Sequence, residues 1–239
     1  VSVDRAGADV WRHADEFAPH ASVGAPPDDF NLMGQNWGLP PLRPDRLVAH
    51  RYRSFIDTMR AAMRHAGAIR IDHVLGLMRL FWIPQGRTAQ QGAYVHYPLE
   101  DLLAIVALES QRNRCMVIGE DLGTVADELR AALARRDVLS YKLLWFERDA
   151  QGEFKRPEAY AHKALVAIST HDLATLAGWW SGEDLLVRLE LGLYPTREAY
   201  EHQLADRAED RKRLLRALHG AQLVDGHADS EISQEVVLS

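Results

Sequence analysis

Cysteine is almost absent from this sequence, which contains one residue of this type, Cys115. One thiol cannot form a disulfide within the chain, so a disulfide-stabilised secreted fold is excluded and a reducing compartment is favoured. We therefore predict a cytoplasmic location. Cys115 lies inside the apolar run 114–118, so we expect it to be a small buried hydrophobe rather than a nucleophile.

Long apolar runs and strong basic clusters are also missing. No apolar stretch approaches 18 residues, so we predict no membrane span, and the N-terminus lacks the basic start and apolar run of a signal peptide. The formal net charge is −6, and short basic runs such as Arg211–Arg213 are typical of helix surfaces. Nucleic acid is therefore not an expected partner. The sequence does not indicate an oligomeric state.

An initiating methionine is likewise absent. The chain opens with Val1-Ser2-Val3-Asp4, which is typical of the end of a strand. We therefore expect the chain to be a fragment of a longer polypeptide.

The sequence does contain short apolar runs that alternate with longer helical patterns, and this alternation predicts βα units around a parallel sheet. The segment 21–44 is rich in Pro, Gly, Asn and Asp and predicts a long, ordered loop. Strands are expected at 68–72, 115–119, 140–146 and 164–169, with a stub at 1–3. A short helix is expected within 8–17, and longer helices at 45–65, 99–110, 124–136 and 196–218.

Three of these strands end in acidic residues, Asp72, Glu120 and Asp172, which are 48 and 52 positions apart. We expect these three carboxylates to converge on one mouth of the sheet. One unit of an eight-stranded (β/α)8 TIM barrel takes about 31 residues, so one unit with an insertion at 76–97 and then two compact units fit these intervals. The predicted fold class is α/β, a partial (β/α)8 barrel with a helical C-terminal part. Residues 1–224 are expected to form this catalytic domain, and residues 225–239 a tail without fixed structure.

Each strand end has a functional and a structural interpretation. Residues two apart in a strand share a face, so Arg70 can keep the Asp72 carboxylate ionised, as a glycosidic nucleophile requires, or can form a structural ion pair. Glu120 is preceded by Gly119, which suits a general acid/base, although a turn before a helix is an alternative. His171 and Asp172 can bind a metal, act in a triad, hydrogen-bond a sugar or form a solvated pair.

Aromatic residues accompany these segments. Flat apolar rings suit the faces of a glucose unit, and Trp37 and Phe30 lie in the expected loop. Trp37 is flanked by Gly34-Gln35-Asn36 and Gly38, and we predict that it belongs to a site. For Trp82 and Trp179-Trp180 we expect positions in the core.

Four segments together resemble the 4-α-glucanotransferases of glycoside hydrolase family 77. They are Gly24–Phe30 with Gly34–Gly38, then Arg70–His73, then Gly119–Gly123, then Thr170–Leu173, and the likeness runs from Val1 to about Leu218. The Asp that the family carries in its first motif would lie upstream of Val1. The resemblance implies strands 3 to 7 of the barrel, without a metal or cofactor.

The resemblance also implies a mechanism and partners. Asp72 would attack the anomeric carbon of an α-1,4-glucan, Glu120 would act as the acid/base, and Asp172 would stabilise the distorted sugar. Donors and acceptors would be maltooligosaccharides and glucose. The substrate-binding residues it implies are Arg70, His171, Gln35, Trp37, Phe30 and His73.

Three alternatives remain at this point. An α-glucan hydrolase would use the same chemistry with water as the acceptor. A metal-dependent hydrolase would use His73 and His171 with nearby carboxylates, although no His pair has the helical i, i+4 zinc spacing. A glucan-binding fragment would bind maltodextrin without turnover.

Overall fold

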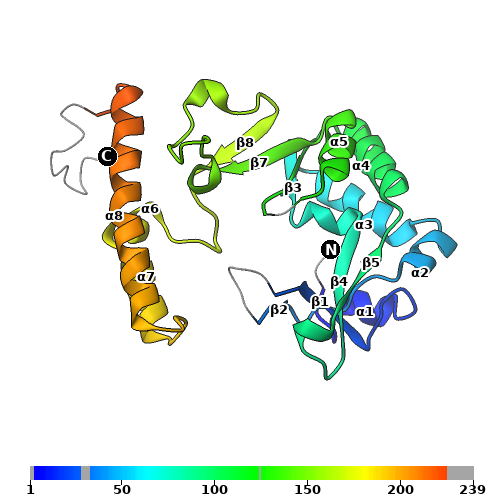
Figure 1. The fold of residues 1–239 in the computed structure, drawn as a ribbon. Coiled ribbons are helices and arrows are strands. Elements are labelled where there is room, and N and C mark those ends of the chain that lie inside the picture. The colour runs from blue at the N-terminus through cyan, green and yellow to red at the C-terminus, as the bar shows by residue number, and fades with distance from the viewer. Residues whose placement is uncertain (1–2, 28–32, 124, 225–239) are drawn as a thin grey trace. The chain divides into compact units, whose positions relative to one another are not determined.

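A computed structural model describes residues 3–27, 33–123 and 125–224 of the chain. The chain divides into two compact units, Val1–Ser140 and Tyr141–Ser239. Figure 1 labels their elements in chain order. None of the helices in the described ranges is both long and apolar enough to cross a bilayer.

A parallel sheet carries the βα units of the first compact unit. Strand β3 (Ala68–Ile71) pairs in parallel with β6 (Met116–Gly119), and β6 pairs in parallel with the first residues of β7 (Leu139–Leu143). Helix α4 (Leu99–Asn113) lies between β3 and β6 in the sequence, and α5 (Asp127–Arg135) lies between β6 and β7. The strands expected at 68–72 and 115–119 and the helix expected at 99–110 are therefore confirmed.

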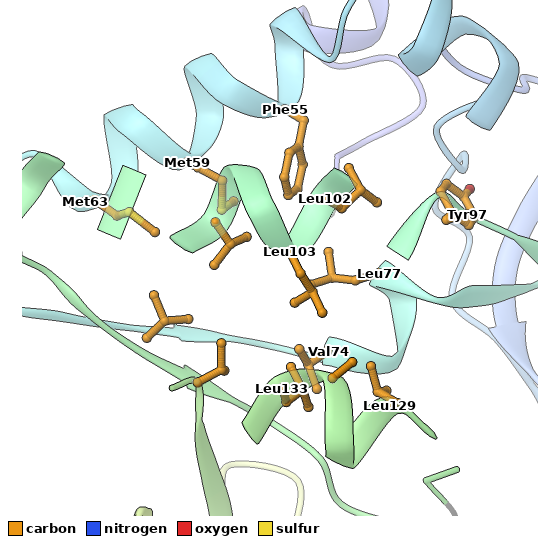
Figure 2. Packing of buried hydrophobic residues seen from close by; sticks show 14 of the residues in the cluster. Phe55, Met59, Met63, Val74, Leu77, Tyr97, Leu102, Leu103, Leu129 and Leu133 are labelled. Atoms are coloured by element: carbon orange, nitrogen blue, oxygen red, sulfur yellow. The ribbon is translucent and has the colours of Figure 1, made fainter. Parts of the chain in front are cut away.

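The apolar faces of these helices form one core with α3 (Arg53–Met63). Phe55, Met59 and Met63 recur at helical spacing on α3, and Figure 2 shows them on the side of α3 that faces the cluster containing Leu102 and Leu103 of α4. Each such side chain contributes about 1.5–3 kcal/mol when it is fully buried. Cys115 belongs to the same core, so the expectation of a small buried hydrophobe is confirmed, and burial raises the pKa of its thiol.

A second, antiparallel sheet lies in the segments that were expected to be a loop and an insertion. Strands β1 (Ala21–Ala25), β2 (Gln35–Asn36), β4 (Arg79–Pro84) and β5 (Ala93–His96) have the order β2-β1-β4-β5. The prediction of a continuous loop at 21–44 was therefore wrong. The short run 21–25 carries little periodicity, and its strand depends on pairing with β4, almost 60 residues later in the chain.

The remaining helices of the first unit follow the predictions in part. Helix α1 (Ala8–Arg12) is the short helix expected within 8–17. The region 45–65 forms two helices, α2 (Pro44–Ala49) and α3, separated by Arg51 and Tyr52 with positive φ. Helix α5 begins at Asp127 rather than after Thr124, which lies outside the described residues. Val3 is described and is not in a strand, whereas the other two residues of the expected stub, 1 and 2, are not described.

In its described residues, the second unit contains the end of β7, strand β8 (Ala164–Ala167) and the α-helices α6 (Leu176–Ser181), α7 (Glu183–Glu190) and α8 (Arg197–Gly220). The expected strand at 140–146 becomes a 3₁₀ turn after Leu143. Trp179 is buried and Trp180 packs against the same cluster, as predicted for the core. Helix α8 confirms the pattern at 196–218, and the expected tail at 225–239 lies outside the described residues.

Candidate active site

Two of the predicted carboxylates follow paired residues of neighbouring strands. In the parallel ladder of β3 and β6, Ile71 is the partner of Gly119, and the next residues are Asp72 and Glu120. The pairing continues past the strand ends, because the Glu120 N–H donates to the Ile71 carbonyl at 2.9 Å. The N–H of Val74 in turn donates to the Glu120 carbonyl at 3.1 Å. The backbones that carry the two acids are thereby fixed side by side.

The Glu120 side chain is held by backbone amides. Its Oε2 accepts a hydrogen bond from the N–H of His73 at 2.8 Å, and its Oε1 accepts one from the N–H of Leu122 at 2.8 Å. The residue is half-buried. Both oxygens therefore have a fixed direction before any substrate is bound, which is the preorganisation that proton transfer to a bound group requires.

Asp72 differs from Glu120 because its side chain faces solvent. The side chain is 69 % exposed, and its Oδ1 lies 2.7 Å from Nη1 of Arg70. The ion pair suggested by their spacing in the strand is therefore present. An accessible carboxylate beside a guanidinium is available to an incoming electrophile, which suits a nucleophile.

His73 connects this pair of acids to the segment that contains Trp37. The ring centroids of Trp37 and His73 are 5.2 Å apart with an interplanar angle of 86°, an edge-to-face contact. The indole N–H of Trp37 donates to the side-chain oxygen of Gln35 at 2.9 Å. Gln35, Trp37 and His73, all predicted to bind substrate, thus lie together with Glu120.

The conformation and ionisation of His73 are both unusual. Its backbone is left-handed, with φ 47° and ψ 57°, a region that residues with a Cβ rarely adopt. Burial lowers the pKa of its imidazole, while the charges of Glu120 and Asp72 act in the opposite direction. Burial therefore favours the neutral form of the ring, which makes an edge-to-face contact with Trp37.

Asp121 anchors the end of β6, although the sequence reasoning gave it no role. Its carboxylate is buried, accepts a hydrogen bond from the Ser140 hydroxyl at 2.7 Å and lies 3.6 Å from a guanidinium nitrogen of Arg130. A signal was available in the sequence, because two adjacent acids at a strand end point to opposite sides. One of the two acids therefore needs hydrogen-bonding or charged partners inside the protein, and here that acid is Asp121.

Asp172, the third predicted acid, belongs to the second unit and lies on a turn after β8. The Oδ2 atom of Asp172 is 3.3 Å from Nε2 of His171, and both side chains are 74 % exposed. The Asp172 N–H donates to the hydroxyl of Thr170 at 3.2 Å, which shapes the turn. The convergence of Asp172 with the other two acids stays a prediction. Phe30 lies outside the described residues.

Two cavities open in the first unit away from these acids. One, of about 390 Å³, is lined by the end of α4 and the starts of β6 and β7, and the other, of about 530 Å³, by residues 17–21 and 43–45 with Trp82 and Val95. Within the described ranges, no group of three or more His, Cys, Asp or Glu side chains is arranged to hold a metal ion.

Comparison with known proteins places these features in a family. The family described as 4-alpha-glucanotransferase matches residues 1–238. A 4-alpha-glucanotransferase of Haemophilus influenzae is 44 % identical over 231 residues, which are 97 % of this chain and 33 % of that protein. One of Mycobacterium tuberculosis is 43 % identical over 245 residues, covering 100 % of this chain and 33 % of that protein.

Solved structures show the same relationship. Amylomaltase from Corynebacterium glutamicum matches with a TM-score of 0.91 and 36 % identity, covering 100 % of this chain and 34 % of that one. Amylomaltase from Streptococcus agalactiae in complex with acarbose, with 23 % identity, a TM-score of 0.68 and coverage of 92 % and 44 %, shares the fold. The chain has an α/β fold with a parallel sheet that resembles amylomaltase and spans about one third of the length of its curated relatives. It belongs to the 4-alpha-glucanotransferase family, glycoside hydrolase family 77.

Proposed function

We propose that this chain carries the reacting acids of a 4-alpha-glucanotransferase, which moves segments of α-1,4-glucan from a donor to the 4-hydroxyl of an acceptor glucan or glucose. One observation carries the proposal: Asp72 and Glu120 follow the paired residues Ile71 and Gly119 of parallel strands. Paired strands lie about 4.8 Å apart. That separation is close to the roughly 5–5.5 Å between the carboxyl groups of retaining glycosidases.

The first half of the reaction would form a covalent glycosyl-enzyme. Asp72, ionised and exposed beside Arg70, attacks the anomeric carbon, and the bond from that carbon to the leaving oxygen breaks. Glu120 in its acid form gives its proton to the leaving oxygen. The backbone amides on both oxygens of Glu120 hold the acid in place during this step.

The second half would transfer the glycosyl group to a sugar. Glu120, now a carboxylate, removes the proton from the acceptor 4-hydroxyl, the acceptor oxygen attacks the anomeric carbon, and Asp72 leaves. Trp37 and Gln35 bind the acceptor through an aromatic face and a polar edge, because the indole is exposed and hydrogen-bonded to Gln35. A sugar held there reaches the intermediate ahead of water.

The remaining assignments of the proposal rest on the family. Asp172 would stabilise the distorted sugar through its hydroxyls, with His171 beside it. Residues 1–224 would form the part of a (β/α)8 barrel that runs from strand 3 to strand 7. The substrates would be α-glucans, because the curated relatives are 4-alpha-glucanotransferases. The lone buried cysteine suits a cytoplasmic protein.

Incubation with maltotriose tests this function. The complete gene product that contains this sequence is expected to give a ladder of longer oligosaccharides together with glucose and maltose. Shorter products alone would establish hydrolysis instead. Loss of activity in EDTA would support the metal-dependent alternative. The 239-residue chain, assayed in parallel, would be a glucan-binding fragment if it bound maltodextrin without disproportionation.

A further inference from the structure

We propose that His73 is a positioning residue that couples the occupancy of Trp37 by an acceptor sugar to the carboxylate of Glu120. The inference rests on the proposed function and adds to it a means by which transfer is favoured over hydrolysis. His73 contacts both partners, Glu120 through its backbone N–H and Trp37 through its ring.

Both contacts of His73 are made by the same residue. Its N–H donates to Oε2 of Glu120 at 2.8 Å, and its ring makes an edge-to-face contact with Trp37 with centroids 5.2 Å apart. A displacement of the indole therefore reaches the N–H of His73 through the Cβ and Cα atoms of this residue. The second oxygen of Glu120 stays on the N–H of Leu122, which acts as a pivot.

The backbone at His73 has few alternatives. A left-handed residue with a Cβ is strained and persists only where surrounding bonds hold it. Here the N–H of Gly76 donates to the His73 carbonyl at 2.8 Å, and the N–H of Val74 donates to the Glu120 carbonyl. Because the His73 backbone is held in this way, a displacement of its ring moves its N–H group as well.

The charges around His73 allow it to act as a packing element. Glu120 and Asp72 face the ring from the ends of β6 and β3, and Arg70 pairs with Asp72. The ring meets Trp37 through an aromatic contact, so no ion pair between the two residues has to break when Trp37 moves. Coupling therefore travels through packing and one hydrogen bond.

The consequence concerns the second half of the reaction. Glu120 must then accept a proton from whichever molecule approaches the glycosyl-enzyme. A sugar on Trp37 presses on the indole and shifts the bond between His73 and Oε2, so that this oxygen turns toward the acceptor hydroxyl. A water molecule does not cover the indole and leaves Glu120 on its two amides. The base is thus engaged by a sugar more readily than by water.

A double-variant cycle in the complete gene product tests the coupling. His73→Gly keeps the N–H and the left-handed backbone but removes the ring, whereas His73→Phe keeps an aromatic edge. We expect His73→Gly and Trp37→Ala each to lower the ratio of transfer to hydrolysis about tenfold, and the combined variant to lower it about tenfold rather than a hundredfold. His73→Phe should restore the ratio to within about twofold of the wild type.

Product ratios with maltotriose, measured at several glucose concentrations, provide the readout, and melting temperatures show which variants are folded. If His73→Gly is poorly folded, His73→Asn takes its place, since Asn also adopts the left-handed region. An unchanged ratio in the ring-deleted variant, or losses that multiply in the combined variant, would overturn the coupling while the proposed function stands. A wild type that forms no ladder would overturn the proposed function first.

Discussion

The two compact units hold their candidate acids in different ways. In the first unit, Glu120 is half-buried and both of its oxygens accept backbone N–H groups, and the strand that carries it is paired with the strand of Asp72. In the second unit, Asp172 is 74 % exposed and contacts its neighbour His171. Parallel strand pairing therefore fixes the backbones of Asp72 and Glu120 relative to each other. The orientation of Asp172 is instead set by contacts within its own turn after β8.

The largest effect is expected from removing the nucleophile of the first unit. Asp72→Asn should lower the rate of transfer by about 10⁴-fold or more, because the amide cannot form the glycosyl-enzyme. The affinity for maltodextrin should stay within about threefold, because the variant keeps the shape of the site. Initial rates with maltotriose and binding titrations in the complete gene product measure the two quantities.

A matched control for this variant is Asp9→Asn, which changes an exposed acid in the first turn of α1. Its rate should equal that of the wild type. Transfer retained by Asp72→Asn would refute the role of nucleophile. The rate of transfer of Asp172→Asn, compared with that of Asp72→Asn, measures whether the exposed acid of the second unit contributes as much to the rate as the exposed acid of the first.

The next largest effect is expected on stability, from an ion pair between helices α3 and α4. The Glu109 side chain of α4 is 2 % exposed and binds Arg60 of α3 at 2.8 Å and Arg112 at 3.0 Å. Glu109→Gln should lower the free energy of unfolding by about 3 kcal/mol, the low end for breaking a buried pair, because Arg60 is partly in water. In the second unit, Glu201→Gln removes the exposed pair with Arg197 and should cost less than about 0.5 kcal/mol. Urea titrations of both variants give the comparison, and equal losses would contradict it.

Lowering the pH should remove the stabilisation that the ionised Glu109 side chain provides. The hydrogen bonds from Arg60, with those from Arg112, lower the pKa of Glu109 to about 2, compared with 4.5 for an unperturbed Glu. Because the pKa of the folded state is the lower one, the stabilisation is complete above pH 4.5 and disappears as the pH falls toward 2. The difference in unfolding free energy between wild type and Glu109→Gln should therefore shrink between pH 5 and pH 3. A constant difference would show that ionisation of Glu109 is not its source.

Much of the parallel sheet could be predicted from the sequence, because its strands are short apolar runs that end in charge. The antiparallel sheet could not be predicted in the same way. The pattern Ala21–Ala25 is small and weakly apolar, and its strand depends on β4 as a partner. The break between α2 and α3 also went unpredicted, because Arg51 and Tyr52 adopt positive φ without a Gly to indicate it.

The residue types of the site were easier to predict than its contacts. The ion pair between Arg70 and Asp72 could be predicted from their spacing, because residues two apart in a strand point to the same face. The edge-to-face contact of Trp37 with His73 required the fold, because it joins residues 36 positions apart that follow strands of different sheets. The N–H donors on Glu120 have no signal in the sequence, because every residue except proline supplies one.

A smaller effect tests how the antiparallel sheet places the acceptor side. Gly24 lies opposite Asn36, and a Cβ added to it would lie 2.0 Å from the Gln35 carbonyl oxygen and 2.7 Å from Cδ1 of Ile83. Gly24→Ala must therefore displace β2, with a loss of about 1–3 kcal/mol in stability. The ratio of transfer to hydrolysis should fall together with it, since β2 carries Gln35 next to Trp37. Gly67→Ala, where an added Cβ meets nothing within 4 Å, is the matched control, and equal effects of the two would remove β2 from the site.

The smallest effect compares one helix start in each unit. The hydroxyl of Thr196 accepts a hydrogen bond from the N–H of Ala199 at 3.2 Å and caps α8, whereas α5 begins after Ala126, which has no side-chain acceptor. Thr196→Ala should therefore destabilise the second unit by about 1 kcal/mol, and Ala126→Ser should stabilise the first by up to about 1 kcal/mol. Thr88→Ala, which makes no capping bond, is the control for loss of a threonine. Urea titrations followed by circular dichroism measure all three. A loss in Thr196→Ala no larger than in Thr88→Ala would show that α8 is held by its packing on Trp179 and Phe154 rather than by its cap.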